Sequence, residues 1–246
     1  MTTPLNGSLL KGFAILGLLT SKRSEISATN VAADLGLNHA TAHRLLLTLE
    51  EAGALVCYRR GYFSLGPSLQ KLGALAEQSD QLITQARPVI ADLAATLNES
   101  VMICRLSRKG PTCVAVEASD RPFSVTMNIG TVLPMTVTAQ GKLWLASMTS
   151  PELTDWVDDP GTLDALNLDQ VRRDGYARNR GENETCVGAV SVPVLSGGGE
   201  TILTLSAFGM VGRFTDDMVS TTLPALFAAA ENLTDIATGT RRTAPA

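Results

Sequence analysis

The sequence predicts an α+β protein with a small helical N-terminal part and a larger domain in which helices flank an antiparallel sheet. Two observations predict this class: apolar residues repeat with a helical period in the first 50 residues, and strand-like runs alternate with helical ones after residue 100. A third is charge: residues 1–75 carry +3 and residues 76–246 carry −7, within a chain of 246 residues. Such asymmetry is typical of a nucleic-acid-binding part joined to another domain, although chance also produces so small an excess.

The composition excludes several classes of protein. With 45% hydrophobic and 18% charged residues, the chain is too apolar to be disordered. No apolar run reaches the roughly 18 residues of a membrane span, and the first residues do not resemble a secretory signal, so we expect a cytoplasmic protein without a membrane partner. The four cysteines lack Cys-x-x-Cys spacing, and His39 and His43 are the only histidines. We therefore expect buried, reduced cysteines, no metal site and no cofactor.

The N-terminal part is predicted to contain three helices and a hairpin. Ser8 is the expected N-cap of a first helix that ends at residues 22–24. Ser27 is the expected N-cap of a second helix, which stops at Gly36, and Asn38 is the expected N-cap of a third. A short hairpin with a basic tip follows this third helix.

The second and third helices meet at Gly36 and form a predicted helix-turn-helix. The start of the third helix offers slim polar and basic side chains that can enter a major groove and donate hydrogen bonds to bases and phosphates. The hairpin tip can contact the DNA backbone as a wing. The alternative is a helical interaction module whose charges are only solvated. The predicted DNA-contacting residues are Lys11, Ser27, Asn38, His39, Thr41, His43, Arg44, Arg59 and Arg60.

These segments resemble the IclR family of bacterial transcriptional regulators. The similarity lies in GSLLKGFAILGLL, VAADLGLNHATAHRLLLTLEEAGAL and YFSLGPSLQKLG, and it continues downstream. The resemblance implies a winged helix-turn-helix domain over residues 1–66, a linker helix over 67–80, and a GAF-like effector-binding and oligomerisation domain over 81–246. It also implies a homo-oligomer, a dimer or a dimer of dimers, that binds double-stranded operator DNA and a small-molecule effector. Repression and activation of transcription both stay open.

The larger domain is predicted to begin with a helix from Gln81 to Leu97 and to end with a helix that starts at Asp216. No Gly-x-Ser-x-Gly elbow or phosphate loop occurs, and no histidine follows residue 43, so we expect no enzyme. Strands are expected over residues 101–106, 113–117, 123–127, 189–195 and 202–208, with further helices over 138–146 and 168–175.

The resemblance implies an effector pocket in this domain. The family often carries an acid where Asn179 stands and a serine where Phe208 stands. A neutral amide and a ring favour a flat, partly apolar carboxylate over a two- or three-carbon acid, unless Phe208 is simply a core residue. Two alternatives to an effector-responsive regulator are an adaptor without DNA function and an enzyme that uses this pocket. The implied pocket residues are Val125, Met127, Leu133, Ala139, Gln140, Asn179, Val187, Ala189, Ser206 and Phe208, of which Met127 is either a pocket or a core residue.

Overall fold

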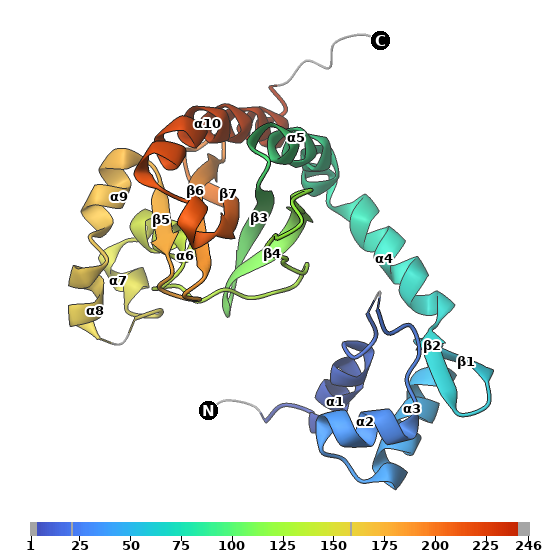
Figure 1. The fold of residues 1–246 in the computed structure, drawn as a ribbon. Helices are drawn as coiled ribbons and strands as arrows, with labels where there is room; N and C mark the ends of the chain where they lie inside the picture. The colour runs from blue at the N-terminus through green and yellow to red at the C-terminus, as the bar shows by residue number, and fades with distance from the viewer. Residues whose placement is uncertain (1–3, 21, 158, 241–246) are drawn as a thin grey trace, which may run out of the picture. The chain divides into compact units, whose positions relative to one another are not determined.

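We analysed a computed structural model of the chain, which describes residues 4–20, 22–157 and 159–240 (Figure 1). The chain divides into two compact units, residues 1–80 and residues 81–246. The first is helical with one hairpin, and the second contains a five-stranded antiparallel sheet flanked by helices. The predicted α+β class is therefore confirmed. Within the described ranges, no helix is long and apolar enough to cross a membrane.

The first unit packs three helices against the hairpin. Ile15, Val31, Leu46 and Phe63 are fully or almost fully buried in its core, one from each of the three helices and one from the hairpin. The hairpin is joined to the segment before the second helix by paired backbone hydrogen bonds between Ile26 and Phe63, at 2.9 and 2.8 Å. The elements are α1 (Gly7–Leu16), α2 (Ala28–Leu35), α3 (His39–Glu51), β1 (Leu55–Arg59), β2 (Tyr62–Leu65) and α4 (Pro67–Ser79).

The first helix differs from its prediction at both ends. Asn6, not Ser8, is the N-cap, since its side-chain oxygen accepts the amides of Ser8 and Leu9 at 3.0 and 3.1 Å. The helix ends at Leu16, before residues 22–24, because Gly17 follows as its C-cap and glycine is a poor helix former. The core position of Ile15 does not depend on either end.

The second unit is built on the sheet order β4-β3-β7-β6-β5, with every neighbouring pair antiparallel. Helices α5 and α10 lie side by side over one face of the sheet, and α6 packs on strands of the other face (Figure 1). The elements are α5 (Gln81–Leu97), β3 (Ser100–Ser107), β4 (Gly110–Glu117), α6 (Ala139–Ser147), α7 (Ser150–Leu153), α8 (Pro160–Ala165), α9 (Leu168–Asp174), β5 (Ala177–Arg180), β6 (Val187–Leu195), β7 (Thr201–Met210), the short 3-10 helix η1 (Val211–Arg213) and α10 (Asp216–Thr238).

Alternation along the strands separates two apolar layers. Val190, Leu205 and Ala207 belong to the layer beneath α5 and α10, whereas Ala189 and Phe208 belong to the layer beneath α6. Because side chains of a strand point alternately to opposite faces, one residue out of register would exchange the two layers. We call the second layer, on the α6 side, the pocket face.

The predicted strand over residues 123–127 is wrong, since these residues form irregular chain. The free edge of β4 is instead covered by a later segment, in which the Thr131 carbonyl accepts the Cys113 amide at 2.9 Å and the Leu133 amide donates to the Pro111 carbonyl at 2.8 Å. Residues 123–127 then cross the pocket face without joining the ladder. Strand β5 and the short helices α7 and α8 were not predicted.

Candidate functional site

The helix-turn-helix is fixed locally at three residues that the sequence predicted, the N-caps Ser27 and Asn38 and the helix stop Gly36. Ser27 and Asn30 form a reciprocal capping box at the start of α2. Gly36 ends α2 with φ +62°, a left-handed conformation in which glycine carries no steric penalty. The Asn38 side-chain oxygen accepts the Thr41 amide at 2.7 Å and caps α3. The start of α3 is therefore held at a defined angle to α2.

Helix α3 presents a polar face to solvent. His39, His43 and Arg44 are exposed, and Thr41 is half-buried. On the opposite side Ala42 and Leu46 are fully buried and anchor the helix in the core. A helix that buries one side and exposes small polar and basic residues at its N-terminal end has the form of a helix that reads the major groove.

The other predicted DNA contacts lie on the hairpin, on α1 and at the α2 cap. Lys11 and Arg60 are exposed. Arg59 donates to Glu25 at 2.9 Å and stacks on the Tyr62 ring at 3.8 Å, so part of its charge is offset within the unit. The Ser27 hydroxyl donates to the Asn30 side-chain oxygen at 2.8 Å, so the cap already engages it.

A second candidate site lies on the pocket face of the sheet. The register aligns Asn179, Ala189, Phe208 and Ser100 in one row across four strands, and all four are buried. Asn179, Ala189 and Phe208 come from three successive strands, and the register of the folded sheet brings these predicted residues together.

Helix α6 and the chain before it cover this row. Val125, Met127, Leu133 and Ala139 pack in one apolar cluster with Ala189 and Phe208. This cluster unites six of the predicted pocket residues, and Phe208 is 1% exposed within it. The other implied residues lie around it: Gln140 on α6, Asn179 on β5, Val187 on β6 and Ser206 on β7.

Polar groups of the pocket face are paired to different extents. The Asn179 side-chain oxygen accepts the amides of Gly181 and Glu182 at 2.9 and 3.1 Å, and the Ser191 and Ser206 hydroxyls bond to each other at 2.8 Å. Gln140 Nε2 and Thr204 Oγ1 are buried and find no hydrogen-bond partner among the residues that the structure describes. Because such groups in folded proteins are normally paired, these two atoms leave hydrogen-bonding capacity unused on this side of the sheet.

The sequence analysis did not predict three further residues of the cluster that contains Phe208. Met102, Cys104 and Cys113 belong to the same cluster, and Met102 lies opposite Ser206 in register. Strand β3 was recognised, but all of residues 101–104 are apolar, so composition did not reveal which of them face α6. The alternation from Met102 to Cys104 was the only available signal.

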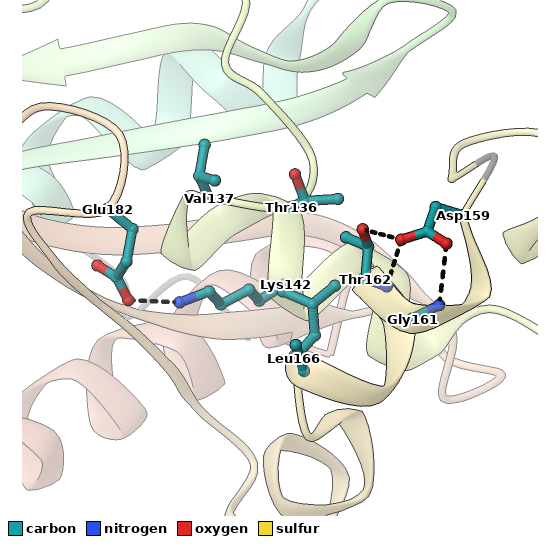
Figure 2. Close-up of a pocket in the computed structure, with 9 residues that line it drawn as sticks. Thr136, Val137, Lys142, Asp159, Gly161, Thr162, Leu166 and Glu182 are labelled. Atoms are coloured by element: carbon teal, nitrogen blue, oxygen red, sulfur yellow. Dashed lines mark hydrogen bonds and ion pairs between the residues drawn. The ribbon is translucent and has the colours of Figure 1, made fainter.

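A separate cleft of about 460 Å³ lies on the outer side of α6, lined by Thr136, Lys142, Asp159 and Glu182 among others (Figure 2). Lys142 Nζ donates to Glu182 Oε1 at 2.8 Å and to the Arg178 carbonyl at 2.9 Å. Burial acts to raise the pKa of Glu182, but the Lys142 hydrogen bond and backbone amides outweigh it and hold that pKa below its usual value. Lys142 thus ties α6 to β5 and the loop after it.

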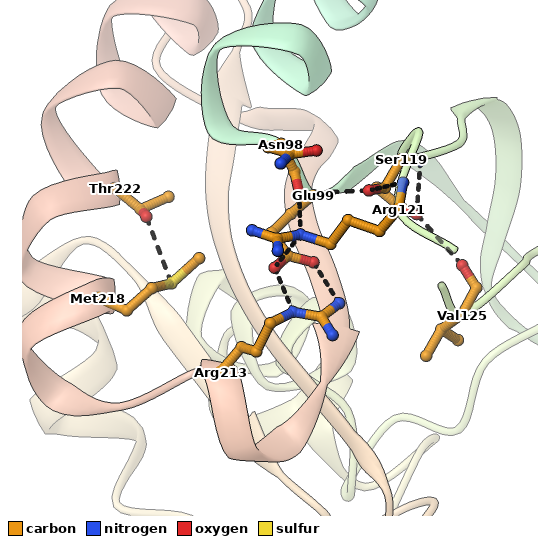
Figure 3. A network of polar contacts seen from close by, with 9 residues as sticks. Asn98, Glu99, Ser119, Arg121, Val125, Arg213, Met218 and Thr222 are labelled. Carbon is orange, nitrogen blue, oxygen red and sulfur yellow. Dashed lines mark hydrogen bonds and ion pairs between the residues drawn. The ribbon is translucent and has the colours of Figure 1, made fainter. Parts of the chain in front are cut away.

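A buried ion-pair network lies where the end of α5, the start of β3 and η1 meet (Figure 3). Glu99 is 1% exposed and pairs with Arg213 through two hydrogen bonds of 2.5 and 2.7 Å. Arg121 lies 3.3 Å from the same carboxylate. The neighbouring Ser100 hydroxyl donates to the Val125 carbonyl at 3.2 Å and so holds the covering chain on the sheet.

Neither unit offers a metal centre in its described residues, where no group of three or more His, Cys, Asp or Glu side chains could hold an ion. A helix-turn-helix unit joined to a separate α/β unit is an organisation typical of DNA-binding regulators. Residues 8–56 match the IclR helix-turn-helix domain, and residues 74–235 match the bacterial transcriptional regulator IclR C-terminal domain. The chain belongs to the IclR family of DNA-binding transcriptional regulators, as its resemblance implied.

Known proteins of the family are similar over nearly the whole chain. The transcriptional repressor IclR of Escherichia coli is 24% identical over 95% of this chain and 92% of its own. The crystal structure of Thermotoga maritima IclR superimposes with a TM-score of 0.75 at 20% identity, covering 93% of this chain and 98% of that one. An IclR homolog from Microbacterium hydrocarbonoxydans, complexed with 4-hydroxybenzoate, gives 0.72 at 21% identity, covering 93% and 98%. These structures share the fold.

Proposed function

We propose that the chain binds operator DNA with α3 in the major groove and with Lys11, Arg44 and Arg60 on phosphates. The exposed polar face of α3, held by the caps at Ser27 and Asn38, is the observation that supports this assignment. Arg59 contributes less than Arg60, because Glu25 already offsets its charge. Ser27 contributes through its cap, which sets the angle of the reading helix.

A gel shift tests this assignment on DNA from upstream of the protein's own gene, against scrambled DNA of equal length. Arg44→Ala is expected to weaken binding by about tenfold or more, because each α3 of a dimer loses one phosphate contact and the counterion release that goes with it. Arg108→Ala removes the same charge from the exposed turn between β3 and β4 and is the matched control. Equal affinities for the two variants would refute the role given to α3.

We also propose that the chain is a homodimer joined through α1 and α4. Leu9 and Phe13 on α1 are exposed, as are Leu72 and Leu75 on α4. None of the described side chains of α4 is buried, and an isolated 13-residue helix is marginally stable in water. A second copy of the chain would cover these faces and would match a pseudo-palindromic operator. A dimer of dimers is the alternative assembly.

Light scattering tests the dimer. Leu72→Glu with Leu75→Glu is expected to shift the particle to the monomer mass, because four carboxylates would meet in the interface. Gln70→Glu with Gln78→Glu, at exposed polar positions of the same helix, is the control for added charge. An unchanged mass for the leucine variant would place the interface elsewhere.

The effector is, in this proposal, a flat carboxylate with an aromatic or otherwise apolar body. Phe208, Leu133 and Val125 provide apolar contact area, and the buried Gln140 Nε2 provides a donor without a partner. Asn179 is neutral, so it repels an anion less than an acid would, although its side-chain oxygen is held by the loop after β5. The 4-hydroxybenzoate bound by the Microbacterium homolog has this chemistry.

A thermal-shift screen tests the effector class. Benzoate and 4-hydroxybenzoate are expected to raise the melting temperature, and pyruvate to raise it less. A ligand at 100 times its Kd stabilises by about 2.7 kcal/mol. Gln140→Leu is expected to abolish the shift, whereas Gln170→Leu, on the outer helix α9, is expected to keep it. Stabilisation of both variants alike would refute the pocket assignment.

The regulator reading also implies a cytoplasmic protein without catalytic activity. Ligand binding would then act by shifting the populations of two arrangements that differ in DNA affinity. An enzyme that uses the pocket is the alternative, and it predicts consumption of the carboxylates that bind. A turnover assay on each stabilising ligand separates the two, since a regulator leaves the ligand unchanged.

A further inference from the structure

Two cysteines stand opposite each other on the pocket face. Cys104 on β3 and Cys113 on β4 are partners in the antiparallel register, and both are 0% exposed. They pack in the cluster that contains Phe208 and Ala139. The remaining cysteines differ: Cys57 is half-buried in the first unit, and Cys186 is exposed.

A β-bulge creates this pairing. Ile103 lies opposite Ala115, but the next residue, Cys104, lies opposite Cys113, so Val114 is an extra residue on β4. Val114 packs against the layer beneath α5 and α10, while Cys113 shares the face of Cys104. In an unbroken ladder Cys104 would face Val114. Bulges often re-aim a side chain next to a functional site, and here the bulge brings two thiols together.

The register is compatible with a disulfide. Directly opposed residues on antiparallel strands have Cα atoms about 4.5–5.5 Å apart, within the roughly 4.4–6.8 Å that a disulfide spans. Cys104 Sγ donates to Met102 Sδ at 3.9 Å, and Cys113 Sγ donates to the Ala115 carbonyl at 3.5 Å. The interaction between the two neighbouring thiols raises the pKa of Cys104 and lowers the pKa of Cys113. Cys113 is therefore the better thiolate nucleophile, and Cys104 is the thiol beside it.

We propose that Cys104 and Cys113 form a dithiol site that a hydroperoxide oxidises to a disulfide, and that this modification regulates the effector pocket. The Cys113 thiolate attacks one peroxide oxygen, the O–O bond breaks, and Cys113 sulfenic acid and hydroxide form. The Cys104 sulfur then displaces the sulfenic oxygen, which leaves as water, and the S–S bond forms. Two thiols and one hydrogen peroxide thus give one disulfide and two waters.

The disulfide would act on the chain that covers the pocket face. The Cys113 amide donates to the Thr131 carbonyl at 2.9 Å, and the Cys113 carbonyl accepts the Gly130 amide at 2.7 Å. Drawing the two sulfurs to about 2.05 Å would shift this anchor point relative to β3 and the pocket cluster. This consequence rests on the proposed effector function, whereas the dithiol chemistry does not.

The test uses the full chain with Cys57→Ser and Cys186→Ser, treated with hydrogen peroxide. We expect a mass loss of about 2 Da, a peptide that links the two strands, and reversal by a thiol reductant. Adding Cys104→Ala is expected to abolish the mass loss and to leave a trappable sulfenic acid on Cys113. Two free thiols after treatment, or higher oxides in place of the linked peptide, would overturn the dithiol site.

The regulatory consequence has its own readout. Benzoate is expected to bind the reduced protein with an apparent Kd at least tenfold lower than its apparent Kd for the oxidised protein. Equal affinities for the two forms would overturn regulation. If neither form binds a carboxylate while the linked peptide forms, the proposed effector fails and the dithiol site stands.

Discussion

The Glu99 network makes a quantitative prediction, because a nearly buried carboxylate there neutralises Arg213. Glu99→Gln keeps the volume of the side chain but leaves the guanidinium without its counter-charge. Breaking a buried ion pair in this way costs about 3–5 kcal/mol. Arg213 remains 27% exposed, so water compensates part of the loss, and we expect about 3 kcal/mol.

The assay is urea unfolding of the full chain, followed by tryptophan fluorescence, which comes from Trp144 and Trp156 of the second unit. In a thermal melt of the same variant, a loss of about 3 kcal/mol in a unit of this size corresponds to a fall in melting temperature of roughly 6–12 °C. Glu99→Gln with Arg213→Met removes both charges and is expected to recover more than half of the loss, since an apolar pair often replaces a buried ion pair. Asp217→Asn, an exposed carboxylate at the start of α10, is the control.

A loss below about 1 kcal/mol for Glu99→Gln, or a double variant less stable than the single one, would refute this reasoning. The first result would mean that water fully compensates the Arg213 charge. The second would mean that packing, rather than the uncompensated charge, dominates the network.

The remaining predictions concern α6, the outer cleft and the pocket. Gly141→Ala is expected to lower the melting temperature by several degrees, because a Cβ there would lie 2.1 Å from the Met135 carbonyl oxygen; unchanged melting would show that α6 moves freely. The lowered pKa of Glu182 means that its pair with Lys142 stabilises the fold above about pH 4.5 and is lost as the pH falls through the folded-state pKa. Between pH 7 and 3, the urea midpoint of Lys142→Met should therefore fall less steeply at the acid end than the urea midpoint of the unmodified protein. Phe208→Ala is expected to cost about 3–5 kcal/mol, and an added aromatic acid should restore part of it in calorimetry; no rescue would mark Phe208 as ordinary core.

Local signals predicted most of the first unit. The caps at Ser27 and Asn38 and the turn at Gly36 are set by neighbouring residues, so the sequence was sufficient to place α2 and α3. The start of α1 was misplaced because Asn6 and Ser8 are both good N-caps, and only the folded helix shows which of them accepts the amides.

The second unit required information that lies far apart in the chain. Helix α5 was predicted at its observed bounds because its apolar period is strong. Strand β5 was missed because its four residues, Ala-Arg-Asn-Arg, are mostly polar, and it becomes a strand only by pairing with β6. Residues 123–127 have the composition of a strand, but they do not pair with β4, because Thr131 and Leu133 already bond to its free edge.

The candidate pocket was only partly predicted, because its residues come from several strands that meet only in the folded sheet. Family resemblance placed Phe208 and Ala189 in it, and the register shows them side by side. The bulge that brings Cys113 opposite Cys104 has no local sequence signature, because one extra residue in a β-strand is visible only against its partner strand.

The salt dependence of DNA affinity tests the central claim most directly. Fluorescence anisotropy with the upstream DNA, over a range of salt concentrations, gives the slope of log affinity against log salt for the full chain and for Arg44→Ala. A dimer that loses one phosphate contact from each α3 is expected to show a slope smaller by about 1.8 units. An identical slope for the two proteins would contradict the assignment of α3 as the helix that binds DNA.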